Sequence, residues 1–111
     1  MFDIYEWEAI DWDDPEDEKG NIAHCLRHGV DEVVVDEVLR ERPVEIKLSP
    51  VYSDFVIAGP DEAWATLWTL LFDRSRKRGD WLRPVTGWKS KRAEVAQWEA
   101  ITRMTWTGSH G

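Results

Sequence analysis

Residues 63–72, Ala-Trp-Ala-Thr-Leu-Trp-Thr-Leu-Leu-Phe, decide the fold of this chain. Apolar side chains alternate onto both faces of this stretch, which predicts a strand covered on both sides at the centre of a sheet. Three more stretches have the spacing and composition of strands: 44–48, 53–58 and 81–88. We expect the four strands to form a mainly antiparallel sheet.

Turn signals separate the predicted strands. Gly59-Pro60-Asp61 lies between the second and the third strand, and the basic stretch 73–80 connects the third to the fourth. Pro84 has no amide hydrogen, which places the fourth strand at an edge or at a bulge. The alternating stretch 8–12 predicts a further short strand near the N-terminus.

Two helices are predicted ahead of the sheet. Asp13-Asp14-Pro15 is typical of a helix start, with an acidic N-cap and proline at the first helical position, and Gly29 is expected to end that helix. Asp31 is expected to cap a second helix, because the aliphatic residues after it fall on one arc at helical spacing. These residues are Val34, Val35, Val38 and Leu39.

A third helix is predicted after the sheet, with Ser90 as its cap and Val95 and Trp98 on its inner face. The sequence therefore predicts a single α+β domain over 1–111. Two N-terminal helices and one C-terminal helix pack on a four-stranded, mainly antiparallel sheet, which a short N-terminal strand extends. The last residues, 104–111, are expected to form a frayed tail.

Composition limits the class of protein. The 111 residues suit one domain, and 42% hydrophobic with 32% charged residues indicate a globular chain. A single cysteine, Cys25, excludes an internal disulfide and fits a reducing cytoplasm. No apolar run approaches the roughly 20 residues of a membrane span, so we expect a cytoplasmic protein with no membrane association.

Charge is distributed unevenly along the chain. The net charge is −8, yet residues 74–92 carry eight bases and a single acid, Asp80. A basic segment within an acidic chain predicts a surface for polyanions beside an acidic surface. A solvated turn with nothing bound is the alternative, and the acidic total argues against tight nonspecific binding of nucleic acid.

Asn21, His24 and His28 share one stripe of the first predicted helix, at spacing i, i+3, i+7. Histidine exchanges protons near neutral pH, which suits general acid–base chemistry. Two histidines at i, i+4 can also bind a metal, but no third ligand is evident, and we expect neither a metal nor a cofactor. The alternative is structural, with His28 as a cation at the helix C-terminus and His24 bonded to the sheet.

A second set of polar residues follows the basic turn. Arg83 and Thr86 lie on the last predicted strand, and three bases lead into the last helix: Lys89, Lys91 and Arg92. Guanidinium and ammonium groups beside a helix N-terminus favour a phosphate site. Ordinary solvated charge with a capping serine is the alternative.

The chain has eight tryptophans, a high count for its length. Three of them have core spacing: Trp64, Trp68 and Trp98. Trp88 and Trp106 have no evident core partner, and such an indole suits stacking on a base or docking a protein. The acidic residues from Asp11 to Glu18 are interpreted as first-turn helix acids and solubilising charge, or as a docking surface for a basic partner.

Several short motifs resemble the BrnT-like toxin family. Trp12-Asp13, Asn21 and His28-Gly29-Val30 match the opening of that family, and the acidic and aliphatic residues 31–39 match its short helix. The stretch Leu82-Arg83-Pro84-Val85-Thr86 resembles the last strand of the family, and Lys91, Arg92 and Glu94 resemble its basic helix start. The resemblance spans about 11–98.

The resemblance implies a RelE-like fold and a metal-independent ribonuclease toxin with a protein antitoxin as partner. Such an enzyme needs a proton acceptor for the ribose 2′-hydroxyl and cations for the phosphorane. The alternative is a non-enzymatic protein of the same fold that binds a protein partner through acidic and tryptophan-bearing surfaces. A third hypothesis is an acidic mimic that occupies a nucleic-acid site on another protein.

The predicted site combines the family motif with the helical stripe. His28, Arg83 and Thr86 match the motif, and His24 comes from the stripe. The predicted catalytic residues are His24, His28, Arg83 and Thr86. The predicted binding residues are Asn21, Trp88, Lys89, Lys91 and Arg92.

Overall fold

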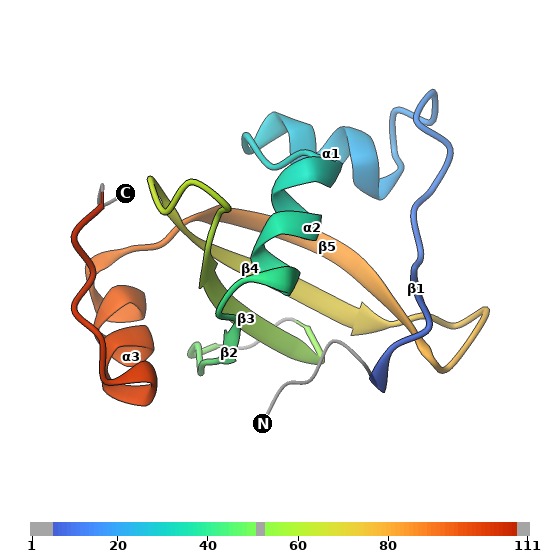
Figure 1. Ribbon diagram of the computed structural model, residues 1–111. Helices are drawn as coiled ribbons and strands as arrows, with labels where there is room; N and C mark the ends of the chain where they lie inside the picture. Colours follow the sequence, from blue (N-terminus) through green and yellow to red (C-terminus); the bar gives the residue numbers. More distant parts are fainter. Residues whose placement is uncertain (1–5, 51–52, 109–111) are drawn as a thin grey trace.

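The computed structural model describes residues 6–50 and 53–108 (Figure 1). Over these residues the fold is α+β, with three helices and an open, mixed sheet of five strands. The strands are β1 (Ala9–Ile10), β2 (Val44–Glu45), β3 (Phe55–Pro60), β4 (Leu67–Arg74) and β5 (Trp81–Lys89). The helices are α1 (Asn21–Arg27), α2 (Glu32–Arg40) and α3 (Arg92–Thr102). The predicted α+β class is confirmed.

The strands lie in the order β1-β5-β4-β3-β2. Consecutive strands from β2 to β5 pair antiparallel. β1 runs parallel to β5 and pairs only with Trp81 and Leu82, the first two residues of β5. The apolar stretch that includes β4 is therefore central, as its two apolar faces predict. A register shift pairs Leu71 with Thr86 but Phe72 with Pro84, so β5 bulges beside its proline, as expected.

Helices cover both faces of the sheet. One core contains α1 and α2 residues such as Cys25 and Val38 together with Leu70 and Phe72 of β4. The other core contains Trp98 of α3 with alternate residues of β3 and β4. Figure 1 shows α1 and α2 on one side of the sheet and α3 on the other, near the end of β5.

Several strand boundaries differ from the predicted ones: β2 spans 44–45 rather than 44–48, β3 spans 55–60 rather than 53–58, and β4 spans 67–74 rather than 63–72. Gly59 and Pro60 do not form a turn but end β3, and the turn lies at 61–66 instead. The Asp61 side chain accepts hydrogen bonds from the amides of Ala65 and Thr66, and the Asp61 amide donates to the Thr66 carbonyl. The Asp61 carboxylate thus organises the turn, and β4 begins later than expected, at Leu67.

The predicted start of the first helix at Asp13-Asp14-Pro15 is wrong, because α1 begins at Asn21 with Gly20 as its N-cap. Asp14 accepts a hydrogen bond from the Glu16 amide, and Asp17 accepts one from the Lys19 amide. These carboxylates stabilise local turns rather than the first turn of a helix. The helix is consequently only seven residues long.

The remaining helix caps give one confirmation and one correction. Asp31 caps α2 as predicted, by accepting a hydrogen bond from the Val34 amide. Ser90 does not cap α3, because its hydroxyl is buried against Thr69, 2.7 Å away. The N-cap is Lys91, whose amide donates to the side chain of Glu94.

The expectation of a frayed tail over 104–111 is wrong at Trp106, which is only 5% exposed. Its ring lies 6.1 Å from that of Trp64 and 5.8 Å from that of Trp98, measured between centroids. Trp106 therefore has core partners, and it closes the α3 side of the sheet. Residues 109–111 lie outside the described residues.

Candidate functional site

Arg83 occupies the centre of the candidate site. Its guanidinium donates two hydrogen bonds to the carboxylate of Asp13, with N–O distances of 2.9 and 2.7 Å. A second carboxylate, Asp11, lies 3.6 Å away. The Arg83 side chain is 33% exposed, and that of Asp13 is 19% exposed. A paired guanidinium in this fork geometry is held in one orientation at the surface.

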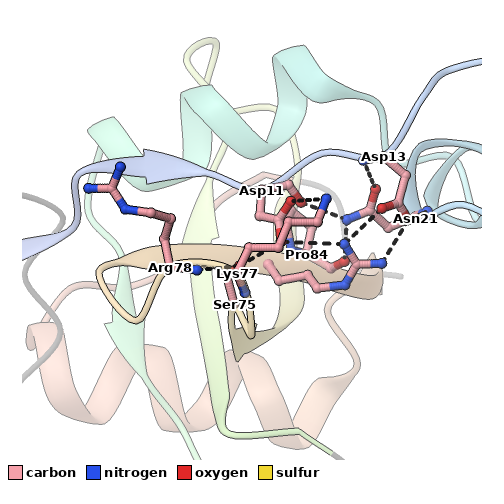
Figure 2. Close-up of polar contacts among 8 residues, drawn as sticks. Asp11, Asp13, Asn21, Ser75, Lys77, Arg78 and Pro84 are labelled. Atoms are coloured by element: carbon pink, nitrogen blue, oxygen red, sulfur yellow. Dashed lines mark hydrogen bonds and ion pairs between the residues drawn. The ribbon is translucent and has the colours of Figure 1, made fainter.

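Asn21, the first residue of α1, is hydrogen-bonded to the Asp13 of this ion pair. Its backbone amide donates to Asp13, and its side-chain oxygen accepts a bond from the Asp13 amide, both at 2.9 Å. Its side-chain nitrogen donates to the carbonyls of Asp11 and Pro84 (Figure 2). Asn21 is buried, so it is a structural contact between α1 and β5 rather than an exposed ligand-binding group. We call Asp13, Asn21 and Arg83 the Asp13 junction.

Asp11 connects this region to the basic turn between β4 and β5. Its buried carboxylate accepts a hydrogen bond from the Ser75 hydroxyl at 2.7 Å and lies 3.7 Å from the Lys77 ammonium (Figure 2). The Ser75 hydroxyl in turn accepts bonds from the amides of Lys77 and Arg78. Polar contacts thus connect the turn to Asp11, the residue that follows β1.

The ion pair changes the acidity of its members. The hydrogen bond from Arg83, with that from the Asn21 amide, lowers the pKa of Asp13 from 3.8 to about 2. Asp13 reciprocally raises the pKa of Arg83. Both groups are therefore charged at neutral pH.

Cys25 lies in the core, away from this ion pair. Burial raises the pKa of its thiol to about 11, which fits packing and not nucleophilic chemistry.

Two hollows flank Arg83. The first, which we call the His24 hollow, has a volume of about 310 Å³. Its charged or titratable lining residues are Lys19, His24, Arg27, Asp73 and Arg83. The second, which we call the turn hollow, has a volume of about 390 Å³. Its lining residues are Asp11, Asp13, Asp73, Arg74, Arg76, Lys77 and Arg83.

The two hollows are local regions of positive charge on an acidic chain. The His24 hollow has three bases against one carboxylate, and the turn hollow has four bases against three. By contrast, a hollow along α2 is lined by four carboxylates and one base. Although the net charge of the chain is −8, the surface around Arg83 carries more bases than acids and therefore suits an anion.

The two histidines of α1 lie next to each other. The centroids of the His24 and His28 rings are 5.1 Å apart. His24 is half-buried and lines the hollow, whereas His28 is the exposed C-cap of α1. The predicted stripe of histidines therefore exists, although its third member, Asn21, has the structural role described above.

The structure does not bring all predicted site residues together. Lys89, Lys91 and Arg92 lie at the far end of β5 and the start of α3, six residues or more beyond Arg83. At about 3.3 Å per strand residue, this separation is roughly 20 Å. Thr86 lies between the two ends and is not among the lining residues of either hollow. The structure therefore does not gather all these residues around one hollow.

Trp88 has partners that the sequence did not indicate. Its indole N–H donates to the Glu94 carboxylate at 2.8 Å, and the Lys91 ammonium lies 5.5 Å from its ring centroid. The same Glu94 oxygen accepts a bond from the Thr69 hydroxyl. This half-buried indole lies at the end of the sheet beside the start of α3, where Glu94 and Lys91 contact it.

The sequence interpretation missed Asp11 and Asp13 as partners of Arg83, and Lys19 and Arg27 as members of the His24 hollow. Asp13 lies 70 residues from Arg83, so no local spacing indicates the pair. Lys19 precedes His24 by five residues, and its position in the hollow depends on the late start of α1. An isolated cation directly ahead of a histidine stripe was the one available signal.

The described residues contain no group of three or more His, Cys, Asp or Glu side chains placed to hold a metal ion. No helix in this part of the chain is long and apolar enough to cross a membrane. In comparisons with known proteins, no protein-family model, no curated protein and no solved structure matches this chain.

Proposed function

We propose that this protein is a BrnT-like, metal-independent endoribonuclease toxin and that the His24 hollow is its active site. The observation that carries the proposal is the shared lining of that hollow by His24 and Arg83, together with Lys19 and Arg27. An imidazole beside several cations is a combination that suits cleavage of RNA by its own 2′-hydroxyl. A protein antitoxin, implied by the resemblance to BrnT-like toxins, belongs to the same proposal.

In the proposed reaction, His24 accepts the proton of a ribose 2′-hydroxyl, and the 2′-oxygen forms a bond to the adjacent phosphorus. The bond between that phosphorus and the 5′-oxygen breaks, and protonated His28 donates a proton to the leaving oxygen. The products are a 2′,3′-cyclic phosphate and a 5′-hydroxyl end. Support comes from the adjacent imidazoles, whose ring centroids are 5.1 Å apart.

The cations of the hollow stabilise the phosphorane in two different ways, through oriented hydrogen-bond donors and through net positive charge. Two of the five N–H groups of Arg83 donate to Asp13, and Asp11 lies 3.6 Å from Nη1, so only the N–H groups that face away from these carboxylates are available to phosphate oxygens. Asp13 offsets much of the charge of Arg83, so Arg83 contributes oriented donors. Lys19 and Arg27 contribute net charge, since neither forms an ion pair within the described residues.

A protein-binding module that uses exposed tryptophans has less support. Trp106 is buried, and the Trp88 indole is bonded to Glu94. The acid cluster has less freedom to mimic nucleic acid as well, because Asp11 and Asp13 pair with bases of the chain itself. The hollow with an imidazole and cations thus favours the ribonuclease.

The test is cleavage of a fluorescently labelled single-stranded RNA by the purified full chain in EDTA. We expect His24→Ala to reduce the cleavage rate by about 10²- to 10⁴-fold, the usual contribution of a general acid or base. Lys19→Ala is expected to weaken cleavage less, because one of several cations is lost. Lys47→Ala, which removes an exposed cation on the β2 side of the sheet, is the matched control and should leave the rate unchanged.

The substrate supplies a second control. RNA with a single 2′-deoxyribose at the cleavage position should resist cleavage there, and the normal product should carry a 2′,3′-cyclic phosphate. Each variant is checked for folding by circular dichroism and urea unfolding. A folded wild type that cleaves no RNA, cleavage that EDTA abolishes, or an equal rate in wild type and His24→Ala each contradicts the proposal.

A further inference from the structure

The turn hollow lies directly beside the proposed active site, and no step of the proposed cleavage uses it. The two hollows share Asp73 and Arg83 in their linings, so they form one continuous surface around the Arg83 side chain. We propose that the turn hollow is a second phosphate subsite, which binds the phosphate next to the cleaved one on a single-stranded RNA. This inference rests on the proposed ribonuclease function. It adds that the protein binds an RNA strand long enough to place two successive phosphates in the two hollows.

The cations of the turn hollow differ in how strongly contacts with other residues restrain their side chains. Arg74 is held in place, because it donates to the Gly79 carbonyl and lies over the Trp7 ring at 4.7 Å. Lys77 lies 3.7 Å from buried Asp11, which leaves its exposed ammonium able to contact another anion. Arg76 is exposed and forms no ion pair with the described residues. Arg76 and Lys77 are therefore the two groups available to a phosphate.

The backbone that carries these two cations is organised before any ligand binds. The Ser75 hydroxyl accepts hydrogen bonds from the amides of Lys77 and Arg78, and it donates to the buried Asp11 carboxylate. Because Asp11 also approaches Arg83 at 3.6 Å, the turn and the active-site arginine share one carboxylate. A preorganised backbone of this kind loses little conformational entropy on binding, so the ordering cost is confined to the Arg76 and Lys77 side chains.

The geometry favours a single strand over a duplex. Attack by the 2′-oxygen needs that atom, the phosphorus and the leaving 5′-oxygen in line, and the stacked A-form helix does not provide this alignment. Two adjacent hollows that share one arginine suit successive phosphates of one extended chain. The carboxylates of Asp11, Asp13 and Asp73 line the same surface and limit its net charge, so binding depends on specific contacts with Arg76 and Lys77.

The test measures binding of 2′-O-methyl oligonucleotides, which cannot be cleaved, to the full-length protein. A dinucleotide with one internucleotide phosphate is compared with a tetranucleotide with three, in the wild type and in the double variant Arg76→Ala/Lys77→Ala. We expect the double variant to bind the tetranucleotide about tenfold more weakly, as for loss of a charge-assisted contact. Its affinity for the dinucleotide should stay within about twofold.

Salt dependence provides a second readout. Loss of one phosphate contact on a single strand should reduce the slope of log affinity against log salt concentration by about 0.7. The matched control is Arg42→Ala/Lys47→Ala, which removes the same charge at exposed positions on either side of β2. This control should retain the affinity and the salt slope of the wild type for the tetranucleotide.

Several results overturn the inference: no binding of the tetranucleotide by the wild type, equal weakening for both lengths, or equal weakening by the control variant. Tighter, Arg76- and Lys77-dependent binding of a 2′-O-methyl duplex overturns the assignment to a single strand. The readout is independent of catalysis. A protein that cleaves no RNA but shows the length-dependent loss contradicts the proposed ribonuclease and retains the subsite.

Discussion

The guanidinium of Arg83 and the carboxylate of Asp13 form a two-bond pair, with Nη1–Oδ1 at 2.9 Å and Nη2–Oδ2 at 2.7 Å. The pair joins β5 to the loop ahead of α1, and Asn21 extends it to the first residue of that helix. His24 lies three residues further along α1. The placement of His24 beside Arg83 therefore depends on the Asp13 junction.

Replacement of the junction carboxylate should destabilise the fold. Asp13→Asn keeps the size of the side chain but removes the charge that the Arg83 guanidinium contacts. We expect the free energy of unfolding at neutral pH to fall by about 1–3 kcal/mol, the cost of losing a charged hydrogen-bond partner. Urea unfolding measures the change. Asp14→Asn, one residue along and exposed, is the control, and an equal loss in both variants would falsify the special role of Asp13.

The same pair predicts an acid-sensitive contribution to stability. The folded-state pKa of Asp13 is about 2, below the value of 3.8 for the unpaired group. A depressed carboxyl pKa stabilises the fold above the unpaired value, and this contribution is lost as pH falls from about 4 towards about 2. The difference in unfolding free energy between wild type and Asp13→Asn should be constant at pH 5–7 and shrink below pH 4. A difference that stays constant down to pH 2 would show that Asp13 does not titrate in this way.

A side chain at Gly87 should disturb the packing of β5 against β4 and against Val30, which lies between α1 and α2. A Cβ atom there would lie 2.6 Å from the Leu70 side chain and 2.9 Å from the Thr69 carbonyl oxygen, beside Val30. We expect Gly87→Ala to lower the unfolding free energy by about 1–3 kcal/mol through overpacking. Gly79→Ala is the matched control, because a Cβ at Gly79 meets nothing within 4 Å. Equal thermal stability of the two variants would contradict the close packing at Gly87.

Trp106 should contribute to stability like a core residue. Its ring packs against Trp64 and Trp98 on the α3 side of the sheet. Trp106→Ala should cost about 3–5 kcal/mol of unfolding free energy, as expected for loss of a large buried aromatic side chain. Met104→Ala, at a position that is 37% exposed, is the control and should cost much less. A loss below 1 kcal/mol for Trp106→Ala would indicate that the segment after α3 is not part of the core.

Signals that act within a few residues predicted much of the fold. Asp31 caps α2 because its carboxylate reaches the Val34 amide within the first turn. The stretch with two apolar faces contains the central strand β4, and Pro84 marks a bulge of β5. Each of these features depends on spacing, capping or a missing amide hydrogen, all of which the sequence displays directly.

Errors arose where a distant partner competed with a local one. Asp13 looks like a helix N-cap, but it binds Arg83 across 70 residues, and the helix starts later. Ser90 looks like a cap for α3, but its hydroxyl is buried against Thr69 of β4. In both cases the side chain satisfies its hydrogen bonds through a tertiary contact that no local pattern reveals.

The sequence by itself determined the α+β class, the central strand and the individual polar residues with chemical potential, including His24, His28 and Arg83. These properties follow from periodicity and from the chemistry of single side chains. Only the tertiary structure decided which of those residues meet. The pairing of β1 with β5 and the Asp13 junction bring α1 to one end of β5, whereas the rise of an extended strand carries Lys89 and Arg92 to the other end.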